Sequence, residues 1–201
     1  MDPEKKLKKN MIAEGKIIDA ALDTIEKHTI SGTRMRLIAE EADMIQSNLH
    51  YYFKTKTDLL MAVLKRVRVR SLEIRTELQK NSEDTLEAGL DLFIGQKKQF
   101  IKNEKKYDYA EIDFWIQSRL TASTQQELSH SFREWRQEIR NMLQKYVPAL
   151  PEEKLEYLPI HFVSMLEGAT LQYLADEEIF DLDKYFEVGK ELLLSQVEKY
   201  R

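Results

Sequence analysis

The chain has 201 residues, 42% of them hydrophobic, which is enough for a sizeable core, and its lack of cysteine excludes disulfides, thiolate chemistry and cysteine-based zinc sites. The low numbers of glycines (6) and prolines (4), with 33% charged residues, favour a mostly helical protein. The net charge of -4 conceals an asymmetry, because residues 1–70 hold 14 basic and 10 acidic side chains, a net of +4. This asymmetry is expected of a chain with a basic DNA-binding N-terminal part and an acidic remainder. Chance variation of the surface charge is the alternative.

Helical spacing of apolar residues predicts four helices in the first 80 residues. We expect them near residues 11–27, 34–41, 46–52 and 57–80. The segment 28–32 breaks the first helix. Thr33 is a good N-cap for the second helix, and Thr55 or Thr57 for the long fourth helix.

The rest of the chain is predicted to be helical with brief breaks. Five further helices are expected near residues 83–102, 107–121, 125–147, 152–175 and 183–199. Pro151 stands where a first-turn proline belongs, and Pro159 falls inside the next helix, which it should kink or interrupt. Because no stretch alternates as a strand does, we expect an all-α fold of about nine helices.

The second and third helices, joined by the tight turn 42–45, have the spacing of a helix-turn-helix unit. Ala39 is small enough for the two helices to cross closely. Four residues on, Asp43 can adopt a left-handed backbone, although glycine would do so more easily. Six residues further, Leu49 anchors the third helix inward. The remaining core of the unit would come from Ile38, Met44 and Phe53.

The segments TRMRLIAEEA (33–42) and LHYYFKTKTDLL (49–60) resemble the signature of the TetR family of transcriptional regulators. The resemblance implies an N-terminal helix-turn-helix DNA-binding domain with a basic arm, residues 1–56. It also implies a C-terminal helical domain for ligand sensing and dimerisation, residues 57–201. The long fourth helix would join the two domains.

Three positions depart from the family's pattern. Asp43 replaces the usual turn glycine, Ile45 the usual cap of the recognition helix, and His50 the usual tyrosine. The first two leave open where the recognition helix begins, and the third would alter a phosphate contact. The lysines of the basic arm would add non-specific attraction to DNA or form a solvated tail: Lys5, Lys6, Lys8 and Lys9.

A recognition helix lies in the major groove, where its N-terminal residues meet base edges. The side chains that could contact bases are Gln46, Ser47, Asn48 and Tyr51. By resemblance, the DNA phosphates would be held by Thr33, His50, Tyr52 and Lys56. The alternative is a merely polar turn at residues 46–48, with the two tyrosines packed in the core.

The resemblance implies that the last two helices of each subunit pair into the four-helix bundle of a homodimer. The expected interface residues are Phe162, Leu166, Ala169, Tyr173, Val188 and Leu192, and an ordinary intrachain core is the alternative. The resemblance also implies a largely apolar ligand pocket. Its candidate residues are Phe100, Phe114, Trp115 and Trp135, although aromatic residues at helical spacing are usually core.

Catalytic patterns are absent from the sequence. The 4 histidines are scattered without metal-ligand spacing, and neither glycine-rich phosphate loops nor nucleophile elbows occur. We therefore expect no enzyme activity, no cofactor and no metal site. No apolar run approaches the roughly 18 residues of a membrane span, and no apolar segment follows the first lysines as in a signal peptide. A cytoplasmic protein without membrane contact is expected.

The predicted function is that of a sequence-specific DNA-binding transcriptional regulator. It would be a repressor that leaves a palindromic double-stranded operator when an unidentified small-molecule effector binds. An effector that shifts the fourth helix would change the spacing of the two recognition helices. Two alternatives remain: a constitutive or activating DNA binder without a small-molecule switch, and a helical binding module with a vestigial helix-turn-helix.

Overall fold

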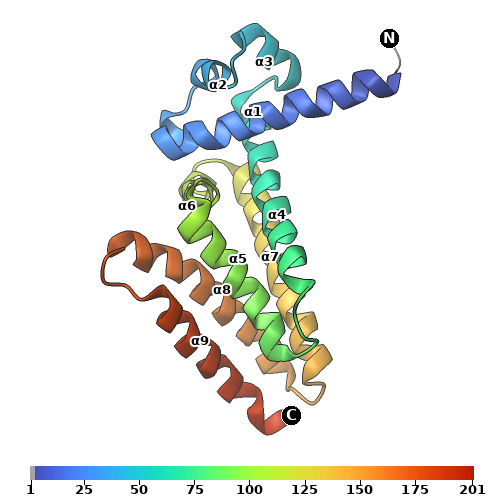
Figure 1. Cartoon of the computed structure of the whole chain (residues 1–201), viewed down its shortest axis with the longest axis vertical. Coiled ribbons are helices and arrows are strands. Elements are labelled where there is room, and N and C mark those ends of the chain that lie inside the picture. The colour runs from blue at the N-terminus through green and yellow to red at the C-terminus, as the bar shows by residue number, and fades with distance from the viewer. Residues whose placement is uncertain (1–2) are drawn as a thin grey trace. The chain divides into compact units, whose positions relative to one another are not determined.

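A computed structural model describes residues 3–201, in which every regular element is a helix (Figure 1). The α-helices are α1 (Pro3–Gly32), α2 (Met35–Glu41), α3 (Gln46–Tyr52), α4 (Lys56–Gln79), α5 (Leu86–Asn103), α6 (Lys105–Ser118), α7 (Ala122–Tyr146), α8 (Glu152–Ala175) and α9 (Leu182–Val197). A short 3-10 helix, η1 (Glu198–Tyr200), follows α9. The predicted all-α fold of about nine helices is confirmed, and most bounds lie within a few residues of the prediction.

The first helix is longer than predicted. It begins at Pro3 rather than near residue 11, and the lysines of the predicted arm lie on it with exposed side chains. Proline is tolerated at the first helical position, and the lysines and glutamates that follow are good helix formers. The predicted break at 28–32 contains one residue with non-helical angles, Thr29 (φ 57°, ψ 168°). Met1 and Asp2 of the predicted arm lie outside the described residues.

The caps of α2 and α4 differ in how well the sequence predicts them. Thr33 does not cap α2, because Arg34 holds the N-cap position and makes no side-chain cap bond. The Thr33 hydroxyl instead donates to the carbonyl oxygen of Thr29 (2.7 Å). Thr55 does cap α4: its hydroxyl accepts from the N–H of Asp58 (3.1 Å), and the Asp58 carboxylate accepts from the N–H of Thr55 (3.0 Å). This reciprocal pair is a capping box.

Both prolines of interest lie in or next to α8. Pro151 is its N-cap rather than a first-turn residue, and the Pro151 carbonyl accepts from the N–H groups of Lys154 and Leu155, each at 3.0 Å. The helix continues through the buried Pro159 as a single element, so the predicted interruption is not observed. A proline removes one hydrogen bond of the helix ladder, and burial of its ring within α8 offsets part of that loss.

Two compact units make up the chain. The first comprises Met1–Arg70 with Glu104–Leu128, so that α6 belongs with the N-terminal helices. The second comprises Ser71–Asn103 with Ser129–Arg201. Both α4 and α7 contribute residues to each unit. The predicted division at residue 57 assigns a DNA-binding role to one part of the chain and a sensing role to the other, whereas the two units are defined by contacts. The division by role stays a prediction.

Each unit has its own buried apolar side chains. Those of the first unit include Ile17, Leu22, Ile25, Ile38, Leu49, Leu59, Val63 and Phe114. The core cluster of the second unit includes Leu90, Phe93, Ile139, Leu143, Phe162, Leu166, Phe186 and Val197. Within residues 3–201, none of the helices has both the length and the apolar character that crossing a membrane requires.

Candidate nucleic-acid interface and effector domain

The turn between α2 and α3 has the geometry that the sequence spacing predicts. Asp43 adopts a positive φ of 54°. The N–H of Met44 donates to the carbonyl of Ala39 (2.9 Å), which closes the turn. Ala39 is 2% exposed and Leu49 is fully buried, so the small residue and the inward anchor lie in the core as expected. The turn at Asp43 and the buried side chains of Ala39 and Leu49 therefore place α3 against α2, as the spacing of these residues predicts.

The N-terminal face of α3 is open to solvent. Gln46, Ser47, Asn48 and Tyr51 are all exposed, as contact with base edges requires. The helix begins at Gln46 after the N-cap Ile45, which makes no side-chain cap bond. The predicted base contacts remain a prediction, but their side chains are accessible. Because the described backbone places these residues in the first two turns of a helix, the alternative of a polar turn at 46–48 is not what forms.

The four candidate phosphate contacts differ in accessibility. His50 and Tyr52 are half-buried, and the Tyr52 ring packs edge-on against Tyr51 with centroids 5.1 Å apart. Thr33 is fully buried. The ammonium of Lys56 donates to the carbonyl of Thr33 (2.7 Å) and to that of Ile30 (2.5 Å). Lys56 thus connects the start of α4 to the end of α1 and to Thr33 just after it, a role that sequence spacing did not indicate.

The electrostatic environment lowers the pKa of Lys56. Burial disfavours its charged form, and the nearby cation of Arg34 acts in the same direction. The Arg34 guanidinium is itself occupied, because it donates to the carbonyl of Ser31 (2.7 Å). Backbone carbonyls at the end of α1 and just after it therefore accept hydrogen bonds from two cations that DNA phosphates would otherwise attract.

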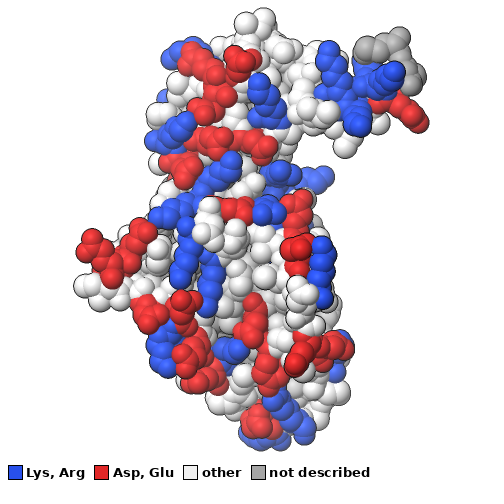
Figure 2. Space-filling model, in the orientation of Figure 1, with Lys and Arg blue, Asp and Glu red and all other residues white. Residues whose placement is uncertain are grey.

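Charged side chains of both signs lie around the helix-turn-helix. Arg36 pairs with Glu40 on α2 (2.5 Å), and Lys27 of α1 pairs with Glu41 (2.9 Å). Lys and Arg side chains gather around the N-terminal end of α1 (Figure 2). Exposed pairs of this kind contribute little to stability, whereas a group of cations attracts phosphates irrespective of sequence.

Helix α6 packs against α1 and forms a hydrogen bond next to Thr29, the residue with non-helical angles near the C-terminal end of α1. The carboxylate of Asp113 accepts from the backbone N–H of Ile30 (2.7 Å). One turn or more away, Lys106 pairs with Asp23 (2.7 Å). Burial raises the pKa of Asp113, and the hydrogen bond from Ile30 opposes that rise. The sequence did not indicate this contact, because its partners are 83 residues apart.

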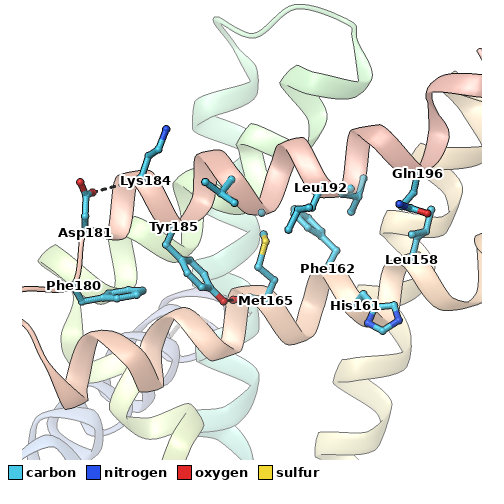
Figure 3. Close-up of a pocket in the computed structure, with 13 residues that line it drawn as sticks. Leu158, His161, Phe162, Met165, Phe180, Asp181, Lys184, Tyr185, Leu192 and Gln196 are labelled. Atoms are coloured by element: carbon cyan, nitrogen blue, oxygen red, sulfur yellow. Dashed lines mark hydrogen bonds between the residues drawn. The ribbon is translucent and has the colours of Figure 1, made fainter.

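A groove of about 720 Å³ lies between α8 and α9 (Figure 3). Its lining is mostly apolar and includes Leu158, Phe162, Met165, Tyr185, Val188 and Leu192. The Tyr185 hydroxyl donates to the carbonyl of Met165 (3.0 Å), and Gly189 lets α9 approach closely, because any Cβ there would collide with the sulfur of Met165. These contacts hold α8 and α9 together beside the apolar groove.

The predicted dimer-interface residues fall into two groups. Phe162, Leu166 and Ala169 are buried within this chain, although Phe162 also lines the groove. Val188 and Leu192 are 41% and 65% exposed. Tyr173 is half-buried. Sequence spacing missed several exposed apolar side chains of α8: Tyr157, Ile160, Leu171 and Leu174.

The aromatic residues predicted for a ligand pocket are divided between the units. Phe114 and Trp115 lie on α6 in the first unit, fully buried and 39% exposed respectively. Phe100 on α5 is fully buried in the second unit. Trp135 on α7, in the same unit, is half-buried, and its indole nitrogen is buried without a hydrogen-bond partner. Their role as ligand contacts remains a prediction.

A left-handed turn between two short helices, with an exposed polar end on the second, defines a DNA-binding protein of the helix-turn-helix class. Residues 17–63 match the family described as bacterial regulatory proteins, tetR family. The helix-turn-helix of this chain is therefore similar to that of this family. The match covers α2, α3 and the adjoining parts of α1 and α4, which are the elements that form the turn and its core.

Similar proteins extend the comparison beyond the helix-turn-helix. An uncharacterised HTH-type transcriptional regulator from Xanthobacter autotrophicus is 40% identical over 76 residues, which are 38% of this chain and 37% of that protein. The match thus spans little more than a third of that relative. The fold is similar to a transcriptional regulator from Saccharomonospora viridis in complex with choline (TM-score 0.79, 15% identity, 91% and 96% of the two chains). It is also similar to FadR from Bacillus subtilis in complex with stearoyl-CoA (TM-score 0.77, 17% identity, 90% and 98%).

Proposed function

We propose that this protein is a homodimeric, sequence-specific DNA-binding transcriptional regulator, a repressor that leaves its operator when a small-molecule effector binds. The observation that carries the proposal is the exposed polar end of α3, presented by a helix-turn-helix with a buried anchor at Leu49. Gln46 and Asn48 are of the type that pairs bidentately with adenine, and Ser47 can contact several bases. The match of residues 17–63 to the tetR family of bacterial regulatory proteins supports the regulatory role.

Dimerisation is supported by the surface of α8 and α9. The groove between these helices has a mostly apolar lining, and Leu192 at its edge is 65% exposed. Exposed apolar patches of this kind mark interaction sites. A dimer would place two recognition helices in successive major grooves, about 34–36 Å apart, and would explain a palindromic operator.

The effector step is supported by two proteins of the same fold whose structures contain choline or stearoyl-CoA. An effector would shift α4, which contributes to both units, or α6, which follows α5 directly in the chain. Any effector acts only through its different affinity for the DNA-bound and released states. The two ligands differ so much in size and charge that they leave the chemistry of this chain's effector open.

Selection of binding sites from random duplex DNA, with the full chain at near-physiological salt, tests the proposal. We expect a palindrome with half-sites one helical turn apart. Gln46→Ala should cost about 1–3 kcal/mol at one base position of each half-site. Gln125→Ala, at an exposed glutamine of α7, is the matched control.

The outcomes separate the alternatives. No enriched sequence, with binding that disappears at moderate salt, would leave a helical binding module with a vestigial helix-turn-helix. An enriched palindrome whose occupancy does not respond to any metabolite extract would favour a constitutive or activating DNA binder.

A further inference from the structure

Helix α1 (Pro3–Gly32) begins well before the part of it that is buried. From residue 4 to residue 16 its side chains are exposed or half-buried, and Ile17 is the first described residue that is buried. An added Cβ at Gly15 would meet nothing within 4 Å, so space is open on that side of the helix. Figure 1 shows this end of α1 reaching beyond α2 and α3. We call residues 3–12, about 15 Å of helix, the α1 extension.

The α1 extension carries apolar and cationic side chains together. Leu7, Met11 and Ile12 are 63%, 64% and 66% exposed. Leu7 and Met11 are four residues apart, so they share one face of the helix. Four lysines and one glutamate give residues 3–12 a net charge of +3, and all four lysines are exposed: Lys5, Lys6, Lys8 and Lys9. The surface is therefore both basic and apolar.

A partner for the α1 extension has to meet both properties. DNA phosphates attract lysines, but they would leave the three apolar side chains in water. Exposed apolar groups that lie together mark contact sites with other macromolecules. The cations around them select a partner of opposite charge. The surface that fits is therefore an acidic one with an exposed apolar side chain.

The loop between α8 (Glu152–Ala175) and α9 (Leu182–Val197) has this chemistry. Residues 176–181, DEEIFD, hold four acidic side chains and no basic one, a net charge of -4. Ile179 lies among them and is 81% exposed, more than any other large apolar side chain of the described residues. We call residues 176–181 the acidic loop. Its charge and its exposed isoleucine are the counterpart of the α1 extension.

A hydrogen bond and a ring contact fix the acidic loop on the second unit. The N–H of Phe180 donates to the carbonyl of Asp176 (2.9 Å). The Phe180 ring packs against that of Tyr185 on α9, with centroids 5.2 Å apart (Figure 3). Phe180 thus packs against the protein, whereas its neighbour Ile179 is exposed. Because the turn is already formed, binding at Ile179 pays less for ordering the loop.

We propose that the α1 extension of one molecule binds the acidic loop of a second copy of this chain. The lysines pair with the carboxylates of the loop, and Ile179 packs against Leu7 and Met11. Because the two surfaces differ, the contact is head to tail and joins molecules into rings or open chains. No residue proposed to contact bases takes part. The inference rests on the proposed function only for its biological role, because molecules joined in this way occupy neighbouring operators cooperatively.

The mass of the full chain in solution tests this contact. Light scattering across a concentration series at about 50 mM salt should show an average mass that rises past that of a dimer. At about 0.5 M salt, where charges are screened within about 4 Å, this rise should disappear. The dimer proposed for α8 and α9 should persist at that salt, because the groove between these helices has a mostly apolar lining.

Charge reversal separates this contact from general attraction. Lys5→Glu with Lys9→Glu should weaken the association about tenfold or more, and so should Asp176→Lys with Glu178→Lys. A mixture of the two variant proteins should associate again, because one keeps the acidic loop and the other keeps the α1 extension. All four changes in one chain should also restore association, because the charges are then exchanged. Lys65→Glu, at an exposed lysine of α4, is the control and should associate as wild type does.

The apolar part of the contact is tested without a change of charge. Ile179→Ser and Met11→Ser should each weaken the association about tenfold. Leu120→Ser is the matched control, because Leu120 is 75% exposed and lies outside both surfaces. All these substitutions are at exposed positions, so each variant should melt at the temperature of wild type.

Two results would overturn the inference: a mass that does not depend on concentration, and an association that neither charge-reversed pair weakens. If the mass is constant and Lys5→Glu with Lys9→Glu flattens the salt dependence of DNA binding, the α1 extension contacts phosphates instead. Operator selection is scored separately. Selection without association contradicts this inference alone, whereas association without selection contradicts the proposed function alone.

Discussion

Asp113 on α6 accepts a hydrogen bond of 2.7 Å from the backbone N–H of Ile30, the residue after the positive-φ Thr29 that interrupts α1. The carboxylate therefore satisfies a backbone donor at the one point where α1 departs from helical angles. Both residues lie in the first unit, where the bond joins two elements that are 83 residues apart in the chain.

Asp113→Asn should change how stability depends on pH. Burial raises the pKa of Asp113 above 3.8 in the folded chain. The native state then binds this proton more tightly than the unfolded chain does. The stability contributed by the group is therefore complete below the unfolded pKa of 3.8 and is lost as pH rises through the folded pKa. Asparagine still accepts from Ile30 but does not ionise, so the variant should gain stability relative to wild type as the pH rises from 3.8 through the folded pKa of Asp113.

Urea denaturation at each pH measures this effect. Glu26→Gln, at an exposed acid of α1, is the control, and it should follow wild type across the range. A stability difference between Asp113→Asn and wild type that stays constant with pH would contradict the assignment of the shift to Asp113.

Substitutions at Asp43 should move stability in opposite directions. Its φ of 54° lies in the left-handed region, where a Cβ is strained and aspartate is tolerated better than most residues. We expect Asp43→Ala to lower the free energy of unfolding by about 1 kcal/mol and Asp43→Gly to leave it unchanged or raise it slightly. Chemical denaturation measures both. Equal destabilisation by alanine and glycine would mean that the carboxylate, not the backbone angle, is what the turn requires.

The helix-turn-helix could be predicted from sequence because its determinants are local. Ala39, Asp43 and Leu49 lie within eleven positions of one another, and each fills a role set by the geometry of a single turn. The same locality explains the accurate bounds of α3 and the cap at Thr55. Local propensity also gave one wrong prediction. Thr33 is a good cap residue, but its hydroxyl donates to the carbonyl of Thr29 instead of capping α2.

Contacts between distant residues could not be predicted from spacing. The oxygens that receive the Lys56 ammonium lie 26 and 23 residues before it, on Ile30 at the end of α1 and on Thr33 just after that helix. The close approach of Gly89 on α5 to Met142 on α7 carries no sequence signal, and neither does the bond from Arg75 to Glu138, 63 residues away. Apolar residues such as Phe162 and Leu192 share the same helical spacing, yet one is buried and the other is 65% exposed. Spacing defines a helix face but not its partner.

Lys56→Met should reveal whether this residue is a tie within the domain or a phosphate contact. Its ammonium donates to the carbonyls of Ile30 and Thr33, so its loss leaves two acceptors without their cation. We expect the free energy of unfolding to fall by about 1–3 kcal/mol. Lys54→Met, at an exposed lysine two residues earlier, should have little effect on stability.

DNA binding by the same two variants measures the second role. The slope of log K against log salt should flatten by about 0.9 for each phosphate contact that is lost. A Lys56→Met protein with wild-type stability and a flatter slope would contradict the structural tie and support the contact predicted from the sequence.

The buried pair of Lys97 on α5 and Glu167 on α8 should be strongly non-additive. The Lys97 ammonium lies 3.0 Å from Glu167 Oε1, and the two side chains are 1% and 8% exposed. Removing one partner of such a pair leaves an uncompensated buried charge, which costs about 3–5 kcal/mol, whereas replacing both with apolar residues of similar volume is often neutral. We expect Lys97→Met and Glu167→Leu each to destabilise severely, and the double variant to recover most of the loss. The exposed pair Lys184–Glu187 (60% and 54%) is the matched control, because its single variants should leave the free energy of unfolding nearly unchanged. Chemical denaturation of all variants gives the coupling energy, and additive losses at Lys97 and Glu167 would mean that the two charges do not depend on each other in the folded chain.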